Sequence, residues 1–140
     1  EYRLTGYKRA LTKAKIPFDD ALVYEAGYSY DAGRKLQPVI ADSGATAVFV
    51  GDDEMAAGLI NASMESGINV PDDLEVVTSN DTIITQITRP AITSITQPLY
   101  DIGAVAMRML TKLMNDKELD EKTVTLPYGI VRRGSTKSAD

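Results

Sequence analysis

Three acidic residues follow an apolar run, at the point where a buried strand would end. Residues 47–50 are Ala-Val-Phe-Val, and Asp52, Asp53 and Glu54 come almost directly after them. Carboxylates grouped beside open backbone can bind a divalent cation or a polar ligand. An aspartate at a helix start instead caps free N–H groups, and acidic residues there complement the helix dipole. The sequence favours capping, with ligand binding and metal chemistry as the alternatives, and Asp52 is the first residue to test.

A second polar group follows the next strand along the chain. Residues 78–82 read Thr-Ser-Asn-Asp-Thr, and Asn80 could hydrogen-bond a hydroxylated ligand or simply form a turn. Tyr28 follows another short apolar run, where its ring could stack on a sugar or cover the sheet edge. The glycine spacing matches neither a phosphate loop nor a dinucleotide fingerprint.

Residues 98–113 have the pattern of an amphipathic helix, with Pro98 as its first helical residue. The apolar stripe consists of Leu99, Ile102, Ala106, Met109, Leu110 and Leu113. The opposite face carries Asp101, Ala104, Val105, Arg108 and Lys112. Small apolar residues between an acid and two bases could dock a partner helix, and Arg108 with Lys112 could hold a phosphate. The alternative is an ordinary solvated face.

Missing residue types exclude several kinds of chemistry. The 140 residues contain no His, no Cys and no Trp, so they offer no Ser-His-Asp triad, no thiolate nucleophile, no disulfide and no ordinary zinc site. Fifteen basic and 20 acidic residues give a net charge of −5, which argues against nucleic-acid binding by these residues. No apolar run is long enough to span a bilayer and no secretory leader opens the sequence, so we expect no membrane partner.

Helical and strand patterns alternate along the chain. This order predicts a mostly parallel sheet with helices on both faces, whose ligands bind beyond the carboxyl ends of the strands. Pro38 predicts a break near Gln37 in the second helix. The expected helices are 2–15, 29–43, 55–66, 83–87 and 98–113, and the expected strands are 21–24, 47–50, 74–77 and 92–95, followed by one more strand after the last helix.

Several segments resemble the LacI/GalR family of transcription regulators. They are residues 6–11, 28–33, 49–56, 89–90 and 97–112, and the resemblance extends over essentially the whole chain. The segment 97–112 is the most specific, because it resembles the catabolite-control subgroup of that family.

The resemblance implies an incomplete effector-binding core of the type I periplasmic-binding-protein kind. Residues 1–97 would belong to its C-terminal subdomain without the first strand. Residues 98–122 would be a crossover helix of the N-terminal subdomain, and 123–140 a returning strand and tail. A helix-turn-helix domain would precede residue 1 and bind operator DNA. Uncovered apolar faces would leave these residues poorly stable alone.

The resemblance also implies a function without catalysis, cofactor or metal. In the subgroup the corepressor is the seryl-phosphorylated phosphocarrier protein HPr, which stabilises the DNA-binding form of a cytoplasmic homodimer that controls carbon catabolite genes. The matching positions are Tyr100, Asp101, Ala104, Val105, Arg108 and Lys112, with Arg108 as the expected phosphoserine clamp. Whether sugar phosphates also bind stays open.

In the wider family a small-molecule pocket uses positions matching Arg3, Tyr28, Asp52, Asn80 and Gln97. This sequence departs from the family pattern, because Asp52 replaces the usual Asn or Thr and Asn80 stands where an acid is usual. A high-affinity sugar site is therefore not expected. Two alternatives are a periplasmic-type sugar-binding protein and an acid-dependent phosphotransfer or metal enzyme using Asp52 and Asp53.

Overall fold

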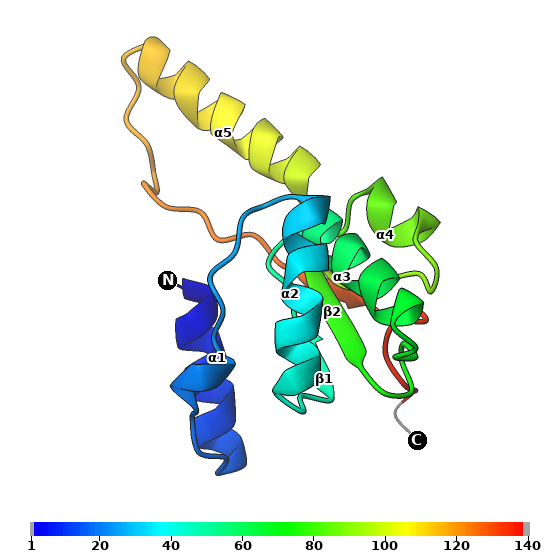
Figure 1. The fold of residues 1–140 in the computed structure, drawn as a ribbon. Coiled ribbons are helices and arrows are strands. Elements are labelled where there is room, and N and C mark those ends of the chain that lie inside the picture. The colour runs from blue at the N-terminus through cyan, green and yellow to red at the C-terminus, as the bar shows by residue number, and fades with distance from the viewer. Residues whose placement is uncertain (1, 139–140) are drawn as a thin grey trace.

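A four-stranded sheet forms the centre of the structure, a computed structural model that describes residues 2–138 (Figure 1). Strands β1 (Ala47–Phe49), β2 (Glu75–Asn80) and β3 (Thr93–Thr96) are parallel. Strand β4 (Gly129–Val131) pairs antiparallel with β3, and the order is β1-β2-β3-β4. The predicted mostly parallel α/β sheet is confirmed.

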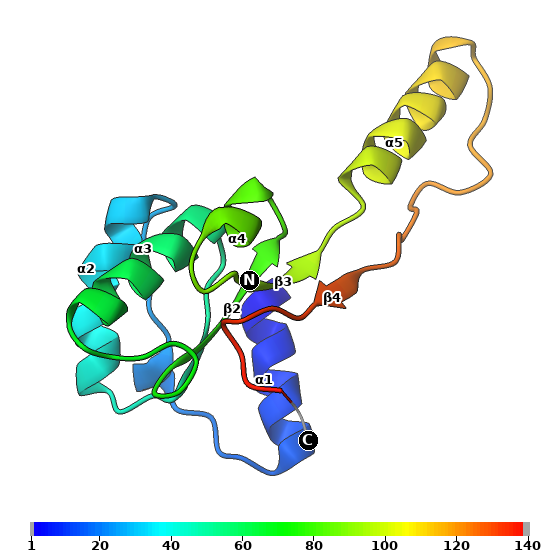
Figure 2. The ribbon, with the colours of Figure 1, turned by 90° about the vertical axis from the view of Figure 1, so that its right-hand side faces the viewer.

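Helices α2 (Tyr30–Asp42), α3 (Asp53–Glu65) and α4 (Ile83–Ile87) lie on one side of this sheet (Figure 2). Their contact with the strands buries one apolar cluster, which removes its side chains from water and supplies most of the driving force for folding. The cluster includes Ile40, Val50, Ala56, Leu59, Ile60, Leu74, Val76 and Ile92.

Helix α2 passes through Pro38 without the predicted break. The reason lies in its packing against α3, where two glycines let the helix backbones approach closely. A Cβ atom on Gly33 would lie 1.9 Å from the carbonyl oxygen of Met55, and one on Gly58 would lie 2.0 Å from that of Tyr30. This tertiary contact outweighs the hydrogen bond that proline cannot donate.

The predicted strand at 21–24 is wrong. A short 3-10 helix, η1 (Asp20–Leu22), begins there, capped by the carboxylate of Asp19, which accepts a 2.9 Å hydrogen bond from the Ala21 N–H. A strand needs a neighbour to pair with its backbone, and the described residues provide none at this position. Helix α1 (Tyr2–Ala14) stands beside the β1 side of the sheet, and none of its residues is buried (Figure 1).

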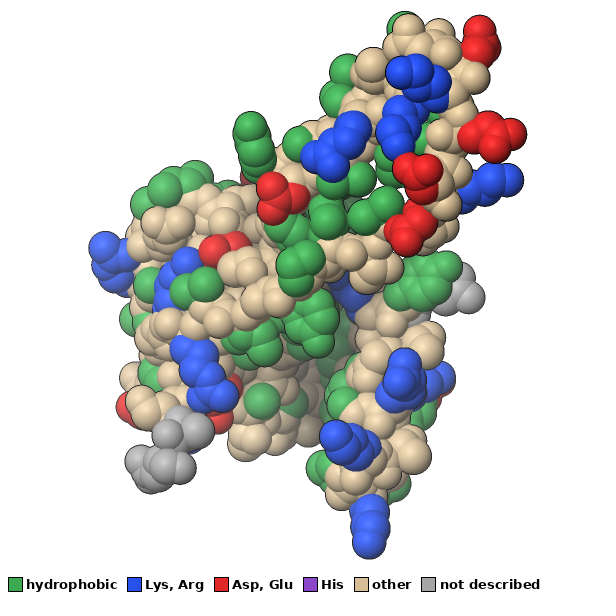
Figure 3. Space-filling view, turned by 180° about the vertical axis from the view of Figure 1, so that it is seen from behind, with side chains coloured by type: hydrophobic (Ala, Val, Ile, Leu, Met, Phe, Trp, Pro, Cys, Tyr) green, Lys and Arg blue, Asp and Glu red, His purple; other side chains and the backbone are tan. Residues whose placement is uncertain are grey.

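The opposite face of the sheet is only partly covered, because Ser79 and Thr93 on it are buried while other side chains are open. Strand register places Phe49, Val77, Ile95 and Ile130 on this face, and Phe49 and Ile130 are 45% and 60% exposed. Hydrophobic side chains are visible over it in Figure 3. The helices of the described residues thus cover one face, and the expected second layer is not formed by them.

Helix α5 (Leu99–Met114) projects away from the sheet, and the chain then returns to β4 (Figures 1 and 2). Pro98 is its N-cap and not its first helical residue, and the returning strand begins only at Gly129. No residue of α5 is buried. Glu1 and residues 139–140 of the predicted tail lie outside the described residues.

No helix within residues 2–138 has the length and apolar character that crossing a bilayer requires.

Candidate functional site

The carboxyl ends of the three parallel strands form a polar rim, which we define as Arg3, Asp52, Asn80 and Gln97. Asp52 follows β1, Asn80 ends β2 and Gln97 follows β3. Parallel strands bring these ends to one edge of the sheet. The guanidinium of Arg3 reaches the same edge and donates a 2.7 Å hydrogen bond to the Gly51 carbonyl oxygen.

Asp52 caps helix α3. Its Oδ1 atom accepts hydrogen bonds from the N–H groups of Glu54 and Met55, at 3.0 and 3.2 Å. The predicted capping role is therefore confirmed. The cap also fixes where this carboxylate stands on the rim, because α3 is packed against the sheet.

Asp53 is a buried structural carboxylate, only 2% exposed. Its Oδ1 accepts a bond from the Thr78 hydroxyl, and its Oδ2 accepts bonds from both the N–H and the hydroxyl of Thr82, at 2.8 Å each. Both oxygens are thus engaged in holding the end of β2 to α3. Residues 2–138 contain no group of three potential metal-ligating side chains. The hydrogen bonds of Asp53 therefore position the rim.

The turn after β2 has an unusual backbone. Asn80 and Asp81 have φ values of 110° and 57°, a region that side-chain-bearing residues rarely adopt. The Asp81 N–H donates to the Ser94 hydroxyl at 3.1 Å, and the Gln97 amide donates to Asn80 Oδ1 at 2.9 Å. These bonds hold the turn in place and fix the Asn80 side chain towards β3.

An ion pair under the turn supports it further. Arg133 Nη1 lies 2.7 Å from Asp81 Oδ1, and the same nitrogen donates to the Ile92 carbonyl oxygen at 2.8 Å. Burial works against ionisation of Asp81. The hydrogen bonds from Arg133 and Thr85, together with the Arg133 charge, outweigh it and lower the pKa of this carboxyl. Arg133 thereby ties the segment after β4 to the end of β2.

Four of the five predicted small-molecule residues meet at the rim. Arg3 bonds to the backbone beside Asp52, and Asn80 bonds to Gln97. Tyr28 is 80% exposed and makes no hydrogen bond or ring contact within residues 2–138. Ser94 and Arg133 were not identified from the sequence, and Asp53 was identified only as a capping, ligand-binding or catalytic candidate and not as a buried support. The one sequence signal for such support is the pair Thr78 and Thr82, whose hydroxyl groups require a hydrogen-bond acceptor such as Asp53 if they are buried.

The predicted corepressor face lies on α5. Tyr100, Asp101, Ala104 and Arg108 are exposed, Tyr100 at 87%. Arg108 forms no ion pair with any residue in 2–138. These four side chains are accessible to a partner.

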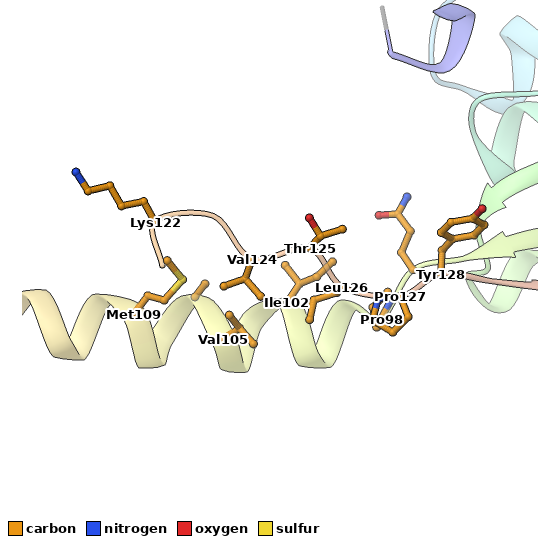
Figure 4. A pocket seen from close by; sticks show the side chains of 12 residues that line it. Pro98, Ile102, Val105, Met109, Lys122, Val124, Thr125, Leu126, Pro127 and Tyr128 are labelled. Carbon is orange, nitrogen blue, oxygen red and sulfur yellow. The ribbon is translucent and has the colours of Figure 1, made fainter. Parts of the chain in front are cut away.

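Val105 departs from this arrangement. It is partly buried and lines an open hollow of about 530 Å³ between α5 and residues 122–128. Figure 4 shows Ile102 and Met109 on the helix side of this hollow, with Val124 and Leu126 on the returning segment. Val105 therefore lies at the margin of the predicted face and not at its centre.

Lys112 is also engaged within the chain. Its Nζ atom lies 2.8 Å from Asp120 Oδ2. The hydrogen bond and the positive charge of Lys112 lower the pKa of the Asp120 carboxyl. Arg108 and Lys112 are one helical turn apart, so both can face one anion once Lys112 is released.

The fold is a mostly parallel α/β domain with a polar rim at its strand ends. Residues 1–136 match the model of the periplasmic binding protein-like domain, and the chain belongs to that family. More particularly, it is similar to part of proteins named catabolite control protein A, one of which is described as a transcription regulator.

Two curated relatives carry this similarity. Catabolite control protein A of Streptococcus mutans is 54% identical over 135 residues, which is 96% of this chain and 40% of that protein. The protein of the same name from Priestia megaterium is 46% identical over 137 residues, 96% of this chain and 41% of the relative. The chain thus spans about two fifths of the length of these relatives.

Solved structures agree with the fold. The transcription regulator CcpA of Lactococcus lactis has a TM-score of 0.92 and 45% identity, covering 96% of this chain and 50% of that one. A transcriptional regulator CelR in complex with cellobiose has a TM-score of 0.88 and 28% identity, with 95% and 41% coverage. A LacI-family regulator from Enterococcus faecium with bound ribose has a TM-score of 0.87 and 29% identity, with 99% and 52% coverage.

Proposed function

We propose that these residues are the corepressor-binding part of a DNA-binding regulator of carbon catabolite control. In this proposal seryl-phosphorylated HPr docks on the exposed face of α5, and Arg108 binds the phosphoserine. Docking favours the DNA-binding orientation of the subdomains, because a ligand shifts a conformational equilibrium towards the state that it binds more tightly.

The proposal rests on the exposed charged face of α5. Its charged face presents Arg108 without an internal ion partner, beside small Ala104 and exposed Tyr100. A guanidinium can hold a phosphate through two parallel hydrogen bonds, and a small residue lets a partner helix approach. The similarity to catabolite control protein A extends through this helix, since the matches cover 96% of the chain.

The proposal also divides the chain. Residues 1–97 and 123–140 form the C-terminal subdomain, whereas 98–122 contribute α5 to the N-terminal one. The projection of α5 and the exposure of its apolar residues support this division. Operator DNA is bound by a domain outside these residues, consistent with their charge of −5, and the regulator acts as a cytoplasmic homodimer.

The direct test is the affinity of seryl-phosphorylated HPr for the regulator that carries this chain. Replacing Arg108 by Ala removes a charge-assisted hydrogen bond worth about 1.5–3 kcal/mol, so binding should weaken about 10- to 150-fold. Arg9→Ala is the matched control, because Arg9 is an exposed arginine on α1. An affinity that stays within about threefold of wild type in the Arg108→Ala protein contradicts the proposed clamp.

A second candidate function is weak binding of a sugar or sugar phosphate at the rim. The relatives with cellobiose and ribose share this fold, but here Asn80 is bonded to Gln97 and Arg3 to Gly51. A ligand would have to replace these internal bonds, so we expect a dissociation constant of about millimolar in calorimetry. Micromolar binding would mean that the rim is a principal effector site.

A further inference from the structure

The segment after α5 is rich in acidic residues. We call residues 116–121 the acidic segment; its carboxylates are Asp116, Glu118, Asp120 and Glu121. In Figure 3 acidic side chains lie close to basic ones around the outer end of α5. The negative charge of the segment is therefore concentrated next to the helix that carries Arg108 and Lys112.

One of these carboxylates forms an ion pair with Lys112, a residue of the predicted phosphate site. Asp120 Oδ2 lies 2.8 Å from Lys112 Nζ, and the side chains are 89% and 40% exposed. No other carboxylate of the acidic segment forms an ion pair within residues 2–138. Of the two basic residues expected to meet a phosphate, Lys112 is occupied and Arg108 is free.

We propose that Asp120 is an internal competitor for the phosphoserine of the docking protein, holding Lys112 until that phosphate displaces it. This inference rests on the proposed function of α5. A phosphoserine carries a charge of about −1.5 to −2 and three acceptor oxygens, whereas Asp120 offers a single negative charge. The phosphate therefore wins the exchange, while an unphosphorylated serine cannot displace the carboxylate.

Competition of this kind attenuates affinity without abolishing it. An exposed ion pair contributes little, because both groups are well hydrated when apart. Removing the competitor should therefore tighten binding about two- to fivefold. Binding of unphosphorylated HPr should not change, because its serine brings no charge to Lys112.

The experiment compares the affinity of seryl-phosphorylated HPr for three forms of the regulator that carries this chain: wild type, Asp120→Asn and Glu121→Gln. The two variants lose one negative charge from the same segment, so their comparison cancels the long-range effect of net charge. Asp120 is exposed, so we expect its substitution to leave the fold intact. Two further proteins are compared with each other: Lys112→Gln alone, and Lys112→Gln combined with Asp120→Asn.

We expect the Asp120→Asn protein to bind at least about twofold more tightly than the Glu121→Gln control, and the gain to vanish when Lys112 is Gln. A smaller gain, or the same gain without Lys112, overturns the inference. If the wild-type protein binds the phosphorylated partner and Asp120→Asn shows no gain, only the competitor is refuted. Failure of the wild-type protein to bind refutes the proposed function as well.

Discussion

Asp53 is the side chain on which the geometry of the rim depends most directly. It is 2% exposed and receives three hydrogen bonds from Thr78 and Thr82. Asp53→Ala leaves these donors without an acceptor, so we expect the free energy of unfolding to fall by about 2–4 kcal/mol in chemical denaturation. Asp72→Ala, at an exposed position, should change it by less than about 0.5 kcal/mol. Equal effects of the two substitutions would show that the buried bonds are dispensable.

The Asp81–Arg133 pair makes part of the stability depend on pH. The pKa of Asp81 is lowered in the folded protein, so its contribution is present above the ordinary Asp value of about 3.9 and is lost as pH falls through the folded-state pKa. The difference in unfolding free energy between wild type and Asp81→Asn should be constant above about pH 5 and shrink below about pH 4. A difference that grows on acidification would contradict the pairing.

Residue patterns predicted where polar side chains would gather, but not how they would pair. Asp52, Asn80 and Gln97 lie at the carboxyl ends of parallel strands. In every parallel sheet these ends lie at the same edge. The Asp53–Thr82 and Arg133–Asp81 contacts depend on loop conformation and on residues 29 to 52 positions apart, which no local pattern encodes.

At the scale of elements, the contact between α2 and α3 determines whether the core can form. Gly33→Ala or Gly58→Ala would push a methyl group into the facing backbone, since each Cβ would lie about 2 Å from a carbonyl oxygen. We expect each to lower the unfolding free energy by about 2 kcal/mol or more. In Gly27→Ala the new Cβ would meet only the Ala32 Cβ, at an ordinary 3.7 Å, and the loss should be much smaller. Thermal unfolding of the three variants measures the difference.

Elements with strong periodicity were predicted well, and the misses have physical causes. The short helix 83–87 and the three parallel strands are at or near their expected positions. The prediction of a strand at 21–24 is wrong because an apolar run does not by itself provide a strand to pair with. The prediction of a break at Pro38 is wrong because packing against α3 outweighs the helix-breaking tendency of proline.

At the scale of the whole molecule, two apolar surfaces are uncovered. One is the sheet face with Phe49 and Ile130, and the other is the exposed side of α5 with Leu110 and Met114. The 140 residues by themselves should therefore bind a hydrophobic dye such as ANS and self-associate. Leu110→Glu should reduce dye binding, whereas Lys117→Glu, which adds the same residue type beyond the helix, should not. Dye binding unaffected by either change would show that α5 is covered in solution.

We propose that α5, and not the rim, receives the phosphorylated partner. Hydrogen exchange of the regulator, with and without saturating seryl-phosphorylated HPr, locates the contact directly. We predict slower exchange in peptides covering residues 99–114, and no such change with unphosphorylated HPr. Protection confined to the rim peptides around 51–53 and 80–81, with α5 exchanging as before, would contradict docking on α5.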